Sequence, residues 1–285
     1  FIGLGECVPY KRYGESIKSV SNEILSISLP VNNQILQKVL KPGAARNALD
    51  CALWDLEAKK EGKPVWQLLN LKEPKPTITA YTISLSNPEK MMQDAKSKSD
   101  YPILKIKLGG QDDEKCIKAV REGSPNSRII VDANEGWNVE SYNYLVPIFK
   151  SIGVELIEQP FPSNKDHLLK NLDRKIPICA DESCHDVKSL EKLMGLYDYI
   201  NIKLDKTGGL TEAINLLQAA KKSGFKIMLG CMVGTSLAMA PALLLSGDCD
   251  IVDLDGPLLL KKDRPNPIRY DDFLAFPISE GLWGV

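Results

Sequence analysis

From Thr77 onward, eight short runs of β-branched and other apolar residues alternate with stretches of helical periodicity. The predicted strands are Ile78–Ile83, Ile103–Leu108, Ile129–Ala133, Val154–Glu158, Ile178–Asp181, Tyr199–Lys203, Lys226–Leu229 and Asp250–Leu254. Strands that alternate with helices at this spacing indicate parallel βαβ units, and eight of them can close a (β/α)8-type barrel. A doubly wound open sheet is the alternative, but no G-x-G-x-x-G turn follows the first strand to support it.

Helical segments are predicted both between these strands and ahead of them. The segments between strands are Glu89–Lys98, Asp113–Glu122, Val139–Lys150, Asp186–Leu196 and Leu210–Ser223. Ahead of the strands, the run from Ala44 to Lys60 carries one apolar stripe at helical spacing, and Gly62 and Pro64 end it. We therefore expect the stripe and Trp54 to face the core.

Composition excludes several classes of protein. Lys and Arg number 36 and Asp and Glu number 37, a balance that argues against a partner made of nucleic acid or acidic membrane. The charge-free stretch 227–247 is long enough to span a bilayer, but glycines and Pro241 divide it, so we predict no membrane span. Seven cysteines without a CxxC pair, and no recognisable signal peptide, favour a reduced cytoplasmic chain.

Charged residues recur at the carboxyl ends of five successive predicted strands. They are Lys107, Asp132, Glu158, Asp181 and Lys203, at intervals of 25, 26, 23 and 22 residues, about one βα unit each. Barrel enzymes keep their active sites at this rim, and randomly placed surface charges would not keep that phase. We therefore expect the five side chains to meet in one site.

The order of these charges predicts a reaction. Three adjacent carboxylates form an all-oxygen site suited to Mg²⁺. Lys107 and Lys203 flank them across the barrel mouth, and Lys105 could lower the pKa of Lys107 by charge repulsion. A metal that holds a substrate carboxylate favours loss of the neighbouring α-proton. Two bases on opposite faces would then racemise or epimerise that carbon.

Weaker signals have ordinary explanations. A single strand-end carboxylate often caps the following helix, and Lys105 or Lys203 alone could lie on a solvated strand end. The segment Lys206–Gly209 lacks the spacing of a phosphate-binding loop and is taken as a turn into the next helix. Cys179, Cys184 and His185 lack a fourth metal ligand and are taken as structural.

The whole series of motifs resembles the enolase superfamily, in the branch of muconate-lactonising enzymes and dipeptide epimerases. K-x-K, D-x-N, E-Q-P, D-E-S and K-x-D occur here in that order and spacing. The segments Ala44–Leu56, Ile178–His185 and Asn201–Ala213 are nearly identical to dipeptide epimerases of the L-Ala-D/L-Glu type. The resemblance covers the chain from Gly5 to Leu282.

This resemblance implies a role for each site residue. Asp132, Glu158 and Asp181 would bind one Mg²⁺ per subunit, Lys107 and Lys203 would be the acid/base catalysts, and Lys105 would support them. Asn134, Glu182 and Asp205 are the further supporting residues. Asp253 and Asp255 match a D-x-D pair that receives the substrate's N-terminal ammonium. Arg12, Cys231 and Met232 are the remaining predicted substrate-binding residues.

The expected fold class is α/β: an enolase-like modified (β/α)7β TIM barrel with a partial N-terminal α+β capping domain. We expect a partial cap at 1–75, because the family's first strands and lid loop would precede Phe1. The barrel would occupy 76–265, and a C-terminal segment at 266–285 would return to the cap. Arg12 is then the candidate for recognising an acidic second residue of the substrate.

The predicted reaction is epimerisation of L-Ala-L-Glu or a related dipeptide, with a role in murein peptide recycling. A muconate cycloisomerase or an o-succinylbenzoate synthase-type lyase of the same branch is the first alternative. Such enzymes need no ammonium receptor, so Asp253 and Asp255 argue against them. A catalytically impaired fragment lacking part of the cap is the second alternative. The partners expected are a small dipeptide and further copies in a homo-oligomer.

Overall fold

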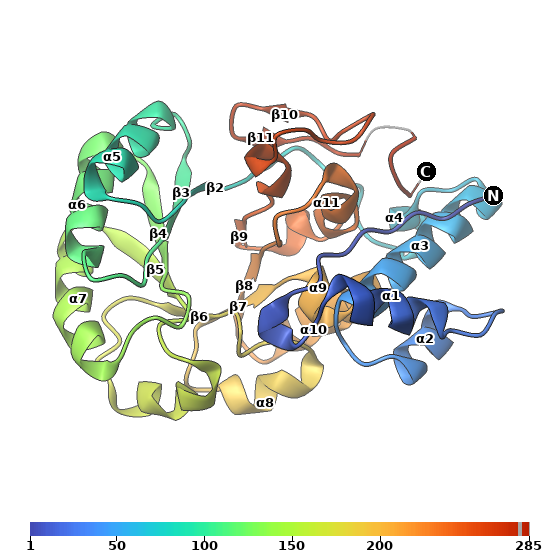
Figure 1. Cartoon of the computed structure of the whole chain (residues 1–285), viewed down its shortest axis with the longest axis horizontal. Coiled ribbons are helices and arrows are strands. Elements are labelled where there is room, and N and C mark those ends of the chain that lie inside the picture. Colours follow the sequence, from blue (N-terminus) through green and yellow to red (C-terminus); the bar gives the residue numbers. More distant parts are fainter. Residues whose placement is uncertain (279–280, 285) are drawn as a thin grey trace.

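Eight parallel strands form one curled sheet in chain order in the computed structural model, which describes residues 1–278 and 281–284 (Figure 1). They are β2 (Tyr81–Ile83), β3 (Ile103–Lys107), β4 (Arg128–Asp132), β5 (Val154–Glu158), β6 (Ile178–Ala180), β7 (Tyr199–Ile202), β8 (Lys226–Leu229) and β9 (Ile251–Val252). At the edges of the sheet, Ala80 N donates a hydrogen bond of 2.8 Å to Val252 O. The predicted enolase-like barrel is thereby confirmed.

Helices cover the outer face of this sheet. They include α5 (Pro88–Ser97), α6 (Asp113–Gly123), α7 (Val139–Ser151), α9 (Leu204–Thr207), α10 (Leu210–Lys222) and α11 (Ser236–Leu243). In Figure 1, α5, α6 and α7 stand outside β3, β4 and β5. Apolar side chains of strands and helices pack into one extensive buried cluster, which holds the strand ends in a fixed frame.

Three of the connections between elements are 3-10 helices. Two of the elements predicted from the sequence differ in the structure. The connections are η2 (Ser163–Asn171), η4 (Ser246–Asp248) and η5 (Gly256–Leu259). The predicted helix Asp186–Leu196 is two short pieces, η3 (Val187–Ser189) and α8 (Leu190–Leu193). The predicted strand Ile78–Ile83 is divided, because β1 (Thr77–Ile78) leaves the barrel to pair with β11 (Leu274–Ala275), which also pairs with β10 (Tyr270–Asp271).

The first seventy residues form a helical cap beside the barrel. Its elements are η1 (Lys11–Tyr13), α1 (Ile17–Leu25), α2 (Asn33–Val39), α3 (Ala44–Glu61) and α4 (Val65–Leu68). The helix predicted from Ala44 is α3, and Gly62 ends it in a left-handed conformation as expected. The expectation about its buried face holds only in part: Ala45 is buried and Trp54 packs against the core cluster. The rest of the apolar stripe is only partly buried, whereas the polar side chains of Arg46, Asn47, Asp50 and Asp55 are buried.

The buried polar face of α3 docks on the turn between α9 and α10. The Arg46 guanidinium donates to Thr207 O at 2.6 Å and to Gly208 O at 3.1 Å. Asp50 accepts a hydrogen bond of 2.9 Å from Thr211 N. At Gly209, where φ is +112°, a Cβ would lie 2.5 Å from Asp50, so the close approach requires glycine. Hydrogen bonds to the barrel explain why this polar face is buried.

Both ends of the chain are tied to α3. Asp55 accepts hydrogen bonds of 2.7 Å from Leu4 N and from Gly284 N. Trp283 Nε1 donates to Cys51 O at 3.0 Å. The described part of the C-terminal segment therefore contacts the cap.

The charge-free stretch 227–247 contains β8 and α11 within the barrel. Among the described helices, none has the length and apolar character required to cross a membrane.

Candidate active site

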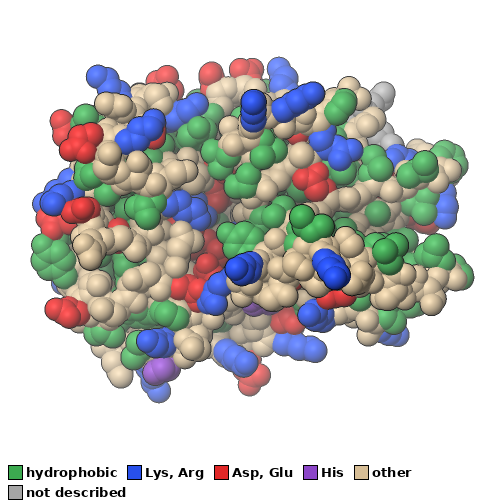
Figure 2. Space-filling view, viewed as in Figure 1, with side chains coloured by type: hydrophobic (Ala, Val, Ile, Leu, Met, Phe, Trp, Pro, Cys, Tyr) green, Lys and Arg blue, Asp and Glu red, His purple; other side chains and the backbone are tan. Residues whose placement is uncertain are grey.

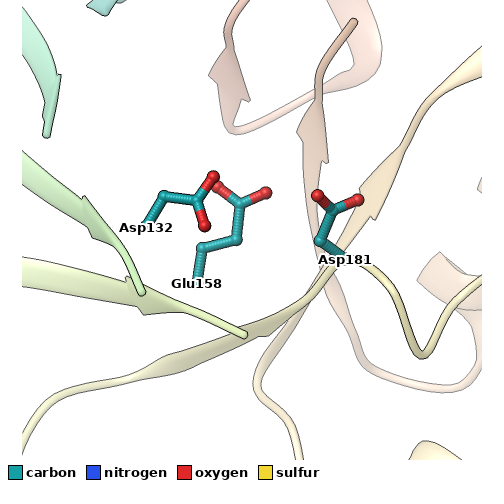
Figure 3. Close-up of side chains that lie close together, drawn as sticks. All are labelled: Asp132, Glu158 and Asp181. Carbon is teal, nitrogen blue, oxygen red and sulfur yellow. The ribbon is translucent and has the colours of Figure 1, made fainter. Parts of the chain in front are cut away.

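The charged strand ends lie side by side because the strands are paired in an even register. Lys107 is paired with Asp132 in the β3–β4 ladder, and Asp132 with Glu158 in the β4–β5 ladder. Asp181 directly follows β6, the next strand of the sheet. Residues paired across parallel strands point to the same face. Three carboxylates from adjacent strands consequently point toward one another (Figure 3).

These three carboxylates have the character of a metal site. One oxygen from each of Asp132, Glu158 and Asp181 lies within 4.8 Å of the others, and all three residues are buried. Carboxylate oxygens are the ligands that Mg²⁺ prefers, and buried acids so close together require a compensating cation. The donor set therefore fits Mg²⁺, and these residues form a metal-binding triad.

Four lysines pair with the triad, and one of them, Lys206, has its Nζ 2.5 Å from Asp181 Oδ1. Lys107 Nζ lies 2.6 Å from Asp132 Oδ2, and Lys203 Nζ lies 2.5 Å from Asp181 Oδ2. Lys105 Nζ lies 2.7 Å from Glu158 Oε2. The side chain of Lys107 is 31% exposed whereas that of Lys203 is 7% exposed. The two predicted catalytic lysines thus occupy opposite ends of the triad, in unequal environments.

The charges in this cluster shift one another's protonation. Burial, together with neighbouring Asp132, raises the pKa of Glu158 to about 7. Burial opposes the charge of Asp181 as well, but Lys203 and Lys206 outweigh it and hold the pKa of Asp181 well below its ordinary value. Burial disfavours the ammonium of Lys203, yet the surrounding carboxylates raise its pKa. A cation that shares the carboxylates would weaken their hold on this proton.

A cavity of about 410 Å³ opens beside Asp181 of the triad. Lys105, Lys107, Lys203 and Asp181 line it from the barrel side. Figure 2 shows acidic and basic side chains meeting in the recess at the centre of the same face as Figure 1. The cap closes the other side of the cavity with three residues, Val8, Tyr10 and Tyr13.

The predicted ammonium receptor lines the same cavity. Asp253 Oδ2 accepts a hydrogen bond of 2.9 Å from Lys105 Nζ, whereas the buried Asp253 Oδ1 has no hydrogen-bond partner in the described part of the chain. Asp255 Oδ2 accepts a hydrogen bond of 2.7 Å from Thr82 N. Burial and neighbouring Asp253 raise the pKa of Asp255 to about 7. Cys231 and Met232 line the same cavity, and their contact with substrate stays a prediction.

Other predicted residues have different surroundings. Asn134 and Glu182 line the cavity, and burial together with Asp181 raises the pKa of Glu182 to about 8. Arg12 is paired with Glu135 and is not among the residues that line the cavity, so its contact with substrate stays a prediction. Asp205 accepts hydrogen bonds of 2.9 Å from Val8 N and from the Asn47 amide. It therefore joins cap to barrel, and its catalytic role stays a prediction.

Three residues that contact the site were not identified from the sequence. Tyr13 lines the cavity, and its ring meets that of His185 edge to face with centroids 4.9 Å apart; no motif indicated either contact. Lys206 was taken only as part of a turn, but it is buried and its Nζ donates to Asp181 O. Gln159, within the E-Q-P motif, accepts a hydrogen bond of 2.9 Å from Asp181 N. The position of Lys206, three residues after Lys203, was the one signal in the sequence that could have indicated its contact with the site.

The placement of Asp205 predicts a pH-dependent stability. Burial raises its pKa to about 6 from an ordinary 3.8, so the folded chain retains a proton that the unfolded chain loses. Folding stability therefore falls as pH rises from about 4 to 6 and the loss persists above that range. Asp205→Asn should raise the free energy of unfolding at pH 7 by on the order of 1–3 kcal/mol. Urea denaturation of both proteins across pH checks this, and a difference that does not vary with pH would contradict it.

A curled parallel barrel with a cap over an acidic triad flanked by lysines defines a metal-dependent barrel enzyme. Residues 89–272 match the family described as enolase C-terminal domain-like, and residues 2–70 match the N-terminal domain of the mandelate racemase / muconate lactonizing enzyme family. The chain belongs to the enolase superfamily, in its mandelate racemase and muconate lactonizing enzyme group.

Two characterised relatives are similar over nearly the whole chain. N-acetyl-D-glutamate racemase from a Pseudoalteromonas species is 46% identical over 290 residues, covering 100% of this chain and 92% of the relative. L-Ala-D/L-Glu epimerase from Escherichia coli is 43% identical over 274 residues, covering 94% of this chain and 85% of the relative. Both names denote inversion of an amino-acid derivative.

Solved structures show the same architecture. An enolase family member from Agrobacterium tumefaciens with homology to dipeptide epimerases, bound to sodium and L-Ala-L-Glu, has a TM-score of 0.97 and 49% identity, covering 99% of this chain and 88% of its own. A dipeptide epimerase from Cytophaga hutchinsonii, in complex with Mg and D-Ala-L-Val, has a TM-score of 0.90 and 28% identity, covering 99% and 84% of the two chains.

Proposed function

We propose that this chain is a Mg²⁺-dependent epimerase that inverts the carbon next to the carboxylate of a dipeptide such as L-Ala-L-Glu. The observation that carries the proposal is the placement of Lys107 and Lys203 at opposite ends of the triad. They lie on β3 and after β7, with the three ligand-bearing strands between them in the sheet. The E. coli and A. tumefaciens relatives support the dipeptide class.

The two lysines perform the proton transfers in this proposal. Asp132, Glu158 and Asp181 would hold Mg²⁺, which when bound supplies positive charge to the substrate carboxylate as the α-proton leaves. The neutral Nζ of one lysine takes the α-proton from one face of the carbon. The ammonium of the other lysine donates a proton to the opposite face, so the configuration inverts and the mass is unchanged.

Asp253 and Asp255 would bind the substrate's N-terminal ammonium. The buried Asp253 Oδ1 accepts no hydrogen bond from the described residues and is available to an ammonium donor. Lys105 already neutralises part of the charge on Asp253, which makes the charge of Asp255 decisive for binding a cation. This receptor favours a dipeptide over the substrates of the lyases in the same branch.

A second candidate function is racemisation of N-acetylglutamate, as named for the Pseudoalteromonas relative. L-Ala-L-Glu and N-acetylglutamate are both N-acylated glutamates, and they differ at the acyl group, where only the dipeptide carries an ammonium. The triad and lysines would serve both substrates equally. The two aspartates are therefore the feature that separates the candidates.

Proton NMR in D₂O with Mg²⁺ tests both candidates. Incubation with L-Ala-L-Glu should remove the Glu α-proton signal and produce peaks of a second diastereomer. N-acetyl-L-glutamate, tested in parallel, should react more slowly if the ammonium receptor operates. Loss of water from a substrate would favour the lyase alternative, and absence of exchange with both compounds would contradict the proposal.

Two further properties are proposed together with the epimerase activity: a role in murein peptide recycling and assembly as a homo-oligomer.

The pH dependence of the two substrates should differ. Below about pH 7 Asp255 gains a proton, because burial raises its pKa, and the site loses attraction for an ammonium. The ratio of kcat/KM for L-Ala-L-Glu to that for N-acetyl-L-glutamate should therefore fall as pH decreases through 7. Taking the ratio cancels every pH effect that the two substrates share. A ratio that stays constant from pH 6 to 8 would contradict the assigned role of Asp255.

A further inference from the structure

Asn201 lies on β7 and its side chain reaches the triad. Its Nδ2 donates a hydrogen bond of 2.6 Å to Glu158 Oε1. Side chains two residues apart on a strand point to the same face, so Asn201 lies one layer deeper in the barrel than Lys203. Asn201 is thus within reach of a metal ligand and away from the reacting carbon.

The Glu158 carboxylate is held from two sides. Asn201 contacts Oε1, and Lys105 Nζ lies 2.7 Å from Oε2. Glu158 and Asn201 are both fully buried, with 0% of each residue exposed. Because the two oxygens of Glu158 are not exposed to solvent, the side chains of Asn201 and Lys105 determine the orientation of the carboxylate.

Gly230, directly after β8, provides the space for the Asn201 amide. A Cβ at this position would lie 2.5 Å from Asn201 Oδ1 and 2.8 Å from Nδ2. The same Oδ1 is buried and accepts no hydrogen bond from the described residues. An unpaired buried amide oxygen destabilises a fold, and an apolar residue of the same size would avoid that cost. The amide therefore serves something other than packing.

We propose that Asn201 is a positioning residue for the metal centre. Its amide fixes the orientation of Glu158 that Mg²⁺ requires, and Gly230 leaves the amide room to do so. Hydrogen-bond partners of metal ligands orient those ligands, and their loss commonly lowers metal affinity. The inference rests on the proposed function only through the Mg²⁺ site and does not depend on which substrate is turned over.

Titration calorimetry with Mg²⁺ alone, without substrate, tests this role. Asn201→Leu keeps the branched shape of the side chain and removes the donor, and it should raise the Mg²⁺ dissociation constant by about 10- to 100-fold. Its thermal midpoint in a chelating buffer should stay close to that of the wild type. Asn47→Leu is the matched control, because it removes an equally buried Asn–carboxylate hydrogen bond of 2.9 Å, to Asp205, and should leave Mg²⁺ affinity unchanged.

Gly230→Ala provides an independent test that retains Asn201. The added methyl group must displace the amide, so Mg²⁺ affinity should fall in this variant too. If Asn201→Leu does not fold, Gly230→Ala decides the question. Unchanged Mg²⁺ affinity accompanied by lower thermal stability would overturn the proposal and make Asn201 a structural residue. Because no substrate is present, failure of dipeptide turnover would not affect this result.

Discussion

Lys203→Ala should abolish epimerisation of L-Ala-L-Glu while one of the two epimers still exchanges its α-proton with solvent. The variant lacks the group that serves one face of the carbon, whereas Lys107, at the other end of the triad, remains. We expect net inversion to fall by about 10²- to 10⁴-fold, the range for loss of an acid/base group. Proton NMR in D₂O, started separately from each epimer, measures exchange and inversion together.

Lys107→Ala is the matched control for this experiment. It should also abolish inversion, but exchange should now persist with the opposite epimer. This reciprocal pattern is specific to two bases acting on opposite faces. Loss of exchange with both epimers in both variants would point to a shared structural defect, and retained inversion in Lys203→Ala would refute the two-base mechanism.

Asp255→Asn should discriminate between the two candidate substrates. The substitution removes a negative charge from the proposed ammonium receptor but keeps an oxygen that can accept the hydrogen bond from Thr82 N. Removing one member of a buried charge pair costs several kcal/mol, so kcat/KM for L-Ala-L-Glu should fall by about 100-fold. N-acetyl-L-glutamate carries no ammonium, and its kcat/KM should change little.

Steady-state kinetics with both compounds under saturating Mg²⁺ checks this expectation. The variant should also lose the fall in substrate ratio below pH 7, because the group that titrates there is gone. Equal losses with both compounds would instead assign Asp255 to the support of β2, through Thr82, and would leave the ammonium without a defined receptor.

The barrel and its charged rim could be predicted because they depend on local patterns. The strand and helix periods are set by neighbouring residues, and parallel pairing brings every carboxyl strand end to one rim. Correct placement of the strands was therefore enough to predict that five charged side chains lie together, those of Lys107, Asp132, Glu158, Asp181 and Lys203. The divided first strand was not predictable, because β1 pairs with β11, almost two hundred residues away.

What the sequence by itself determined was which charges share the rim and in what order. Only the tertiary structure decided what surrounds them: Tyr13 over the cavity, Asn201 beneath Glu158, and Arg12 paired with Glu135. Burial of a polar side chain depends on partners distant in sequence, since such groups are buried only where another segment supplies hydrogen bonds. The spacing of apolar residues along a helix does not indicate those partners. For the same reason the polar side chains buried on α3 were not expected from the sequence.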